Sequence, residues 1–292
     1  MRLLVLTALA MLAFAGNSLL CRMALADGSI DPASFTVIRL VAAAVTLWSI
    51  VLLRGRAAAE PGTTGSWRSA VTLLVYAVCF SYAYVSLSAA TGALVLFGTV
   101  QLTMIAAALL SGERPTGREV LGWLLAIAGF VALLLPGVTA PSLEGTLMMS
   151  VAGIGWGLYS LYGRGESRPL LSTTGNFLRS LLPLAAVGGV AMFEHDLSTR
   201  GIVVAALAGS LTTGLGYILW YAALPDLGSL RAALVQLSVP AIAAAGGILL
   251  LGEIPGVRVV VCGLLILGGI GYATARRRAP GAPAPPGKGP SS

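Results

Sequence analysis

Ten apolar runs of about 20 residues constrain the fold of this chain more than any other feature of its sequence. A helix of about 20 apolar residues is long enough to cross the hydrocarbon core of a bilayer. Hydrophobic residues make up 57% of the chain and charged residues only 10%, which is too little charge to cover a soluble surface. We therefore expect an all-α integral membrane protein with ten transmembrane helices. The expected spans are residues 3–25, 33–53, 68–88, 91–111, 118–136, 143–163, 172–193, 200–223, 229–251 and 256–275.

Two of these runs need a closer reading. The third and fourth are nearly continuous over residues 68–111, which is too long for one span, so we expect a tight hairpin at Ala90–Gly92. The first run could be mistaken for a signal peptide, because Ala24–Ala26 resembles a small-residue cleavage site. The run is too long for that, and polar residues such as Asn17 and Arg22 interrupt its second half. A retained first helix is expected.

Basic residues are unevenly divided between the two sides of the predicted membrane. With the N-terminus inside, thirteen Arg and Lys residues lie in cytoplasmic segments, and only Arg200 and Arg258 lie in external loops. This bias follows the positive-inside rule, so both termini are expected in the cytoplasm. A single Lys and abundant Ala, Leu and Gly point to a GC-rich bacterial source, and hence to the bacterial inner membrane. The Pro- and Gly-rich residues 276–292 are expected to form a disordered tail. The net charge of +7 thus reflects topology, and no nucleic-acid partner is indicated.

The two halves of the chain match each other at an offset of 140 residues. Leu-Leu-Ser-Gly-Glu-Arg-Pro at 109–115 recurs as Leu-Leu-Leu-Gly-Glu-Ile-Pro at 249–255. Five spans per half is an odd number, so the second copy must enter the membrane from the opposite side. We expect two inverted five-helix repeats, residues 1–137 and 138–275, with a substrate site near the midplane where they meet.

These features resemble the drug/metabolite transporter superfamily, and within it the ten-span EamA-type carriers. The resemblance rests on the two Gly-Glu-x-Pro motifs, on Val239-Pro240, and on the pairs Ile38-Arg39 and Leu178-Arg179. Within the superfamily, the chain is most similar to bacterial aromatic amino-acid exporters. The resemblance implies a transporter without enzyme activity or cofactor, whose central cavity is lined by the first, third, fourth, sixth, eighth and ninth helices. The first half has Val100 where the second has Pro240, so any bend made by that proline is expected in one half only.

Aromatic residues gather in a few of the predicted spans. Seven of the eight tyrosines lie in the third, sixth and eighth spans, and several fall three or four residues from another aromatic group, on one helical face. We interpret these faces as the wall of a cavity for an amphipathic solute, with an interfacial belt or ordinary packing as the alternative. The first candidates are Tyr82, Trp156, Tyr159, Tyr217 and Trp220.

Polar amides within the spans are further candidates for binding a solute. Asn17, Gln101 and Gln236 fall on the first, fourth and ninth spans. An amide in hydrocarbon is costly unless it is paired, so these groups are expected to bind the solute's carboxylate and amine or to form interhelical hydrogen bonds.

The charged residues of the repeats are assigned structural or gating roles. Arg39 and Arg179 lie at corresponding depths in the two halves, where snorkelling or structural pairing is expected, with attraction of an anionic solute as the alternative. Glu113 and Glu253 lie beside prolines at loop ends, so we expect them to order helix ends.

The missing residue types narrow the function further. No Asp or Glu lies clearly within a predicted span, and proton relays in membranes normally use such groups. Uniport of apolar or aromatic amino acids is therefore expected, with a proton-coupled carrier of broad specificity as the alternative. Three scattered cysteines and the single His195 indicate no metal site. The alternative from a different functional class is a lipid-handling protein or an intramembrane enzyme. No catalytic residues are indicated for it. The expected partners are a small-molecule substrate and membrane lipid, and no oligomeric state is indicated.

Overall fold

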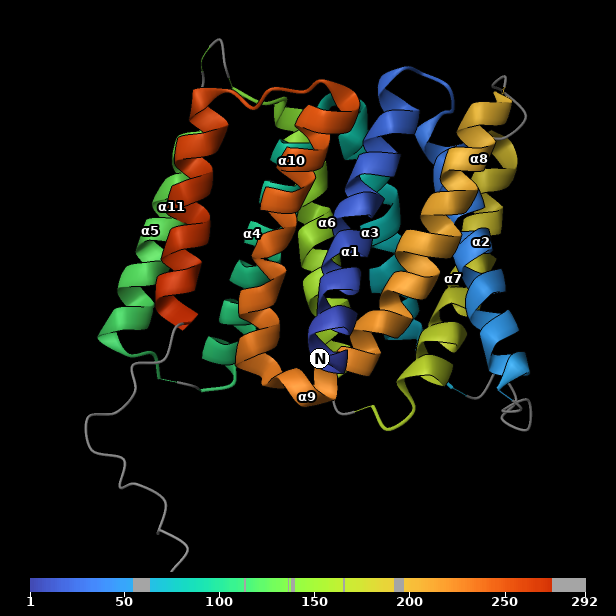
Figure 1. The fold of residues 1–292 in the computed structure, drawn as a ribbon, viewed down its shortest axis with the longest axis horizontal. Helices are drawn as coiled ribbons and strands as arrows, with labels where there is room; N and C mark the ends of the chain where they lie inside the picture. Colours follow the sequence, from blue (N-terminus) through green and yellow to red (C-terminus); the bar gives the residue numbers. More distant parts are fainter. Residues whose placement is uncertain are drawn as a thin grey trace, which may run out of the picture.

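The computed structural model describes residues 1–54, 64–112, 114–135, 137, 140–164, 166–191 and 197–274. Within these ranges every regular element is helical and no strand is present (Figure 1). A π-helical segment, η1 (Ala208–Leu215), joins α8 to α9. The α-helices are α1 (Arg2–Ala26), α2 (Pro32–Leu53), α3 (Trp67–Ser86), α4 (Ala89–Leu110), α5 (Gly117–Leu134), α6 (Leu143–Tyr162), α7 (Pro169–Ala191), α8 (Thr199–Leu207), α9 (Gly216–Gln236), α10 (Ser238–Leu251) and α11 (Val257–Thr274).

Among the residues that the structure describes, eight helical segments are long and apolar enough to cross a membrane. They are α1 to α5, the joined segment Thr199–Leu224, the segment Leu234–Leu251, and α11. By these criteria of length and composition α6 and α7 are not among them, although they lie in the same bundle (Figure 1). The protein is therefore an all-helical, multi-pass membrane protein.

Short polar side chains fix where many of the helices begin. Each accepts a hydrogen bond from a backbone N–H in the first turn, and such a cap stabilises a helix by about 1 kcal/mol. The caps are Asp31 for α2, Ser66 for α3, Ser88 for α4, Thr116 for α5, Ser142 for α6 and Ser198 for α8.

The cap at Ser88 corrects the predicted position of the hairpin between α3 and α4. The break lies at Leu87 and Ser88, and not at Ala90–Gly92. The hydroxyl of Ser88 accepts from the N–H of Thr91, which starts α4 two residues earlier than expected. Gly92 lies inside α4, where its missing side chain admits the ring of Tyr84, because a Cβ there would lie 2.4 Å from that ring.

The boundary between the eighth and ninth predicted spans also differs from the prediction. α9 continues to Gln236, and α10 begins at Ser238 instead of residue 229. Pro240 lies in the first turn of α10, where its missing N–H leaves no helical hydrogen bond unmade. The proline thus marks the start of a helix and does not bend one in its middle.

Glycines let the helices approach closely. An ideal Cβ on Gly122 of α5 would lie 2.5 Å from the carbonyl oxygen of Gly269 in α11, so these two backbones touch. Likewise, Gly153 and Gly155 of α6 bring that helix against the backbones of α4 and α3, respectively. α5 and α11 pair at one edge of the bundle, while α6 packs on α3 and α4, and α1 packs on α8, η1, α9 and α10 (Figure 1).

The recurring Gly-Glu-x-Pro motif ends α10. Gly252 has φ of +66°, a left-handed conformation that glycine adopts without steric cost. The N–H of Glu253 then donates to the carbonyl of Gly247 at 3.0 Å, which pairs a backbone carbonyl near the end of α10. Gly112 has φ of +83° at the matching end of α4, whereas Glu113 lies outside the described residues.

The bundle has two ends. α1 begins and α11 finishes at the same end, which we call the terminal end (Figure 1). The connection between α1 and α2 lies at the opposite end, which we call the distal end (Figure 1).

Candidate functional site

A cluster of aromatic rings lies between α1, α3, α6 and α9. The ring centroid of Trp156 lies 5.1 Å from Tyr217, 5.3 Å from Tyr76 and 6.1 Å from Phe14. Tyr159 stacks on the same indole at 5.6 Å. Edge-on and offset contacts of this kind are the arrangements that aromatic quadrupoles favour. Trp156 is therefore the centre of the cluster.

The cluster surrounds a small space that we call the central cavity. Its volume is about 20 Å³, which is room for about one water molecule, so the cavity is nearly closed in this conformation. Its walls come from α1, α3, α4, α6, η1 and α9. The lining residues are Phe14, Asn17, Tyr76, Phe80, Leu96, Phe97, Trp156, Thr212, Thr213 and Tyr217.

Asn17 is the polar centre of this cavity. Its Nδ2 donates to the Tyr76 hydroxyl at 3.1 Å. Its Oδ1 lies 3.4 Å from Nη1 of Arg39 and 3.4 Å and 3.5 Å from the hydroxyls of Thr212 and Thr213. The side chain thus connects α1 to α2, α3 and η1, and its amide is paired as a buried amide must be.

The π-helical turn of η1 brings both threonines to Asn17. Thr212 and Thr213 are consecutive, yet both hydroxyls reach the same amide oxygen. Gly209 lets η1 lie directly on α2, since a Cβ there would be 2.3 Å from the carbonyl oxygen of Arg39. π-helical turns occur often at functional sites, so the segment is a candidate for a binding or moving part.

The two matching arginines have different surroundings. Arg39 is 1% exposed, so it does not snorkel to a membrane surface. Its Nη2 donates to the carbonyl of Ala77 at 2.9 Å, and its guanidinium lies 5.0 Å from the ring centre of Phe80. Arg179 is partly exposed and binds the carbonyl of Thr64 near the terminal end. The structure therefore buries only the first of the pair deeply.

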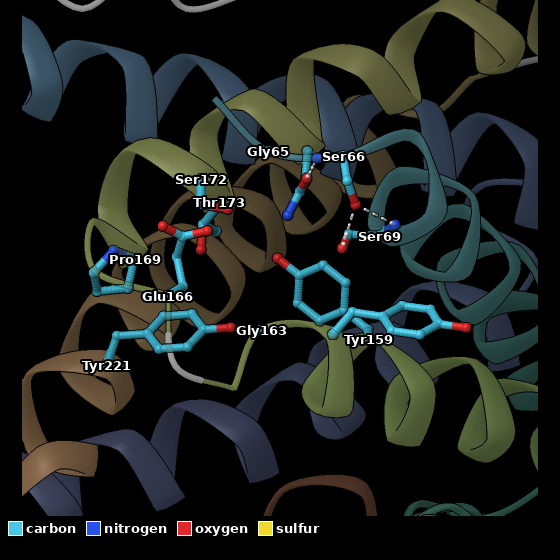
Figure 2. A pocket seen from close by; sticks show the side chains of 12 residues that line it. Gly65, Ser66, Ser69, Tyr159, Gly163, Glu166, Pro169, Ser172, Thr173 and Tyr221 are labelled. Atoms are coloured by element: carbon cyan, nitrogen blue, oxygen red, sulfur yellow. Dashed lines mark hydrogen bonds between the residues drawn. The ribbon is translucent and has the colours of Figure 1, made fainter. Parts of the chain in front are cut away.

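Two larger pockets, which we call the end pockets, open toward the terminal end. The first has a volume of about 120 Å³ and is lined by polar groups of α3, α6, α7 and α9, among them Ser66, Thr173 and Tyr221 (Figure 2). The second has a volume of about 180 Å³ and lies between α2, α7 and α9. Tyr159 lines the first and Tyr217 lines the second. The stacked and edge-on rings of Trp156, Tyr159 and Tyr217 therefore separate both pockets from the central cavity.

The distal end is held mainly by one ion pair. Nε of Arg22 in α1 lies 2.7 Å from Oε1 of Glu253, and its Nη1 donates to the carbonyls of Tyr84 and Val85 at the end of α3. The second carboxylate oxygen of Glu253 accepts from the N–H of Ala89 at 2.8 Å. One arginine and one glutamate thus fasten α1, α3, α4 and the end of α10. Asp27 and Arg200 form a second, more exposed pair nearby.

The predicted site residues fall into three groups. Asn17, Trp156 and Tyr217 line the central cavity, and Tyr159 lines the first end pocket. Trp220 packs on Phe14 with ring centres 5.8 Å apart and is not among the residues that line the central cavity or the end pockets. Gln101 and Gln236 are buried and are not among those lining residues either. Tyr82 is 44% exposed and lies away from the cavity.

Several residues of the cavity were not among the first candidates from the sequence. Tyr76 and Phe80 of α3 line it, as do Phe14 of α1 and the two threonines of η1. Tyr76 and Phe80 are four residues apart and share a face, whereas Tyr82 points elsewhere because it follows Tyr76 by six residues. The helical periodicity groups Tyr76 with Phe80 on one face of α3, but it does not show whether that face or the face of Tyr82 lines the cavity.

Comparison with known proteins matches nearly the whole chain. The model of the EamA-like transporter family matches residues 1–135 and 143–274. An uncharacterized protein of Pseudomonas aeruginosa is 51% identical over 276 residues, which cover 94% of this chain and 96% of that one. An uncharacterized transporter of Archaeoglobus fulgidus is 25% identical over 93% of this chain and 97% of its own length.

Two further similarities are weaker. The threonine/homoserine exporter RhtA of Salmonella typhimurium is 29% identical over 185 residues, which are 60% of this chain and 61% of the exporter. A protein crystal structure matches with a TM-score of 0.62 at 19% identity, covering 93% of this chain and 96% of that chain, which shows a shared fold.

Proposed function

Since this chain belongs to the EamA-like transporter family, we propose that it exports small amphipathic metabolites of the amino-acid class across the bacterial inner membrane. The proposal includes a preference for aromatic or apolar side chains and transport through the central cavity by alternating access. The observation that carries it is the arrangement of Asn17, Thr212 and Thr213 inside a cage of aromatic rings.

The chemistry of the cavity supports an amphipathic solute. The rings of Phe14, Trp156 and Tyr217 offer apolar area and aromatic faces to the apolar part of such a solute. The amide and hydroxyls around Asn17 offer hydrogen bonds to the polar end of the same molecule. The similarity to a threonine/homoserine exporter supports the amino-acid class, while the aromatic lining favours a larger apolar side chain.

The packing of the helices supports two inverted repeats, residues 1–137 and 138–275. A pseudo-twofold axis would exchange α1 with α6, α2 with α7, α3 with the α8–α9 segment, α4 with α10, and α5 with α11. Under this exchange, the packing of α6 on α3 and α4 corresponds to the packing of α1 on α8–α9 and α10. The pairs α2–α7, α4–α10 and α5–α11 correspond to themselves. Repeats of this kind can alternate between two openings.

The two ends of the bundle support a state open to one side. The pair made by Arg22 and Glu253 closes the distal end, and both end pockets lie at the terminal end. The arginine distribution supports a cytoplasmic location of the terminal end. We propose that solutes enter from the end pockets and pass the rings of Tyr159 and Tyr217 to reach the central cavity.

The lining of the central cavity also supports uniport. The ten described residues that line it include no carboxylate and no histidine, the groups that commonly carry protons in membrane carriers. Coupling to protons is the competing proposal, and an imposed pH gradient distinguishes the two.

Counterflow in proteoliposomes tests the function. Purified protein is reconstituted with unlabelled L-phenylalanine, L-leucine or L-threonine inside, and uptake of the same labelled amino acid is measured with and without a protonophore. We expect uptake above that of empty vesicles for at least L-phenylalanine, without an effect of the protonophore. Uptake equal to that of empty vesicles for every amino acid would refute the proposed function, and a strict requirement for a pH gradient would refute uniport.

A further inference from the structure

Arg39 is a buried cation whose contacts are neutral. Its side chain is 1% exposed in the interior of a membrane protein. It donates to the amide oxygen of Asn17 and to the backbone carbonyl of Ala77, and its Nε has no hydrogen-bond partner within the described chain. A buried charge is costly unless an opposite charge balances it. The two ion pairs of the described residues involve Arg22 and Arg200, and neither involves Arg39.

Aromatic rings surround the guanidinium but do not neutralise it. Its carbon lies 5.8 Å from the ring centre of Phe35, 5.8 Å from that of Tyr76 and 5.0 Å from that of Phe80. Ring faces attract a cation through their quadrupole, so they make its burial tolerable while leaving the net positive charge in place.

Only one layer of side chains separates this charge from the central cavity. Asn17, Tyr76 and Phe80 contact Arg39 on one side and line the cavity on the other. In a space of low dielectric with apolar walls, the field of a nearby charge is weakly screened. The cavity therefore lies in a positive potential.

Hydrogen-bond donors on the cavity wall complement this potential. The hydroxyl of Tyr76 accepts from Asn17, which leaves its own proton for another acceptor. The buried hydroxyl of Tyr217 has no hydrogen-bond partner within the described chain. Among the described residues, the hydroxyl of Thr213 has a single, long contact of 3.5 Å to Asn17. An ionised carboxylate accepts hydrogen bonds and carries the missing negative charge, so it fits both properties.

We propose that the central cavity is a carboxylate subsite and that Arg39 supplies its positive charge. The inference rests on the proposed function and narrows its substrate class to solutes with a free carboxylate. The carboxylate binds at Asn17, Tyr76 and Tyr217, and the apolar part of the solute lies against Trp156. Arg39 acts as a positioning residue behind Asn17, and amines or amides without a carboxylate are poor substrates.

Three probes that share a phenyl ring test the subsite directly. L-Phenylalanine carries a carboxylate and an ammonium, 3-phenylpropionate only the carboxylate, and 2-phenylethylamine only the ammonium. The melting temperature of purified wild-type protein is measured with each. We expect a rise with the first two and none with the amine. Equal rises with all three probes, or no rise with any, would overturn the proposal.

Asn17→Asp provides the decisive variant. It places a carboxylate of nearly the same shape beside Arg39 and so imitates the bound solute. Without ligand, its melting temperature should be at least that of the wild type, which also reports correct folding. The concentration of either carboxylate probe that is needed to raise its melting temperature should be about tenfold or more higher than for the wild type. Retention of the wild-type response in folded Asn17→Asp would contradict the subsite.

Charge substitutions at Arg39 separate the positive charge from a purely structural role. Arg39→Gln should lose the preference for carboxylates over the amine, and Arg39→Lys should keep most of it. An unchanged preference in folded Arg39→Gln would show that the charge is only structural. Counterflow of the same probes keeps the two proposals apart, because a wild-type protein that binds carboxylates without carrying them retains the subsite and loses the transport function.

Discussion

Arg22 and Glu253 lie 231 positions apart in the sequence and form an ion pair, with 2.7 Å between Nε and Oε1. Each side chain is 19% exposed, so the pair is shielded from much of the solvent. The same two side chains also bind the backbone at the end of α3 and at the start of α4. Because α1 and α4 belong to one half of the chain and Glu253 to the other, the pair fastens the two halves at the distal end.

Neutralising this pair should open the distal end. In Glu253→Gln, Arg22 loses its counter-charge, and a partly shielded pair of this kind contributes about 1 kcal/mol to the closed state. A cysteine introduced at Leu87, which is buried at the distal end, should then react several-fold faster with a membrane-impermeant maleimide. Arg200→Gln is the control, because its pair with Asp27 is well exposed and contributes little. Equal labelling rates in both variants would show that the pair between Arg22 and Glu253 does not keep the distal end closed.

Replacing Gly252 should disturb the same ion pair, because the backbone conformation of Gly252 positions Glu253. Gly252→Ala places a Cβ at φ of +66°, which costs about 1–2 kcal/mol for an L-residue although no atom lies within 4 Å of the new methyl group. We expect a lower melting temperature together with faster labelling at the distal end. Gly268→Ala is the matched control, since that glycine of α11 also has open space but no positive φ. If both variants melt at the same temperature, the left-handed cap is not important.

The role of the aromatic rings around the central cavity can be tested by comparing the transport rates of two variants that each lose a large side chain. Trp156→Ala removes the ring that contacts Phe14, Tyr76, Tyr159 and Tyr217, so counterflow of L-phenylalanine should fall by about tenfold or more. Tyr82→Ala removes a ring that is 44% exposed, and its transport should stay within about twofold of the wild type. The reverse order of effects would place the cavity on the other face of α3.

The contact between α5 and α11 should be important for stability and not for transport. In Gly122→Ala the new methyl group meets the carbonyl oxygen of Gly269 at 2.5 Å, and overpacking of this kind costs about 1–3 kcal/mol. Gly271→Ala on α11 meets nothing within 4 Å and should be neutral or stabilising. Thermal unfolding in detergent measures both. Folded Gly122→Ala should transport at the wild-type rate, because neither helix lines the central cavity; a lost rate in folded protein would assign the pair a role in movement.

The ends of the helices show which features the local sequence predicts. Ser88 and Gly252 specify the start of α4 and the end of α10 through their own backbone chemistry. The hairpin between α3 and α4 was still misplaced, because in a membrane protein apolar residues continue through the turn, and a single serine marks it.

The sequence by itself determined that the chain crosses a membrane many times as helices, because only hydrocarbon tolerates such a composition. It also contained Asn17, Trp156 and Tyr217, which line the cavity. Only the tertiary structure decided that Tyr76 faces inward and Tyr82 outward, that η1 winds as a π-helix, and that Arg39 is buried beside Asn17. The reason is that lipid and protein interior are both apolar, so hydrophobic periodicity does not distinguish the face of a helix that meets lipid from the face that meets its neighbours.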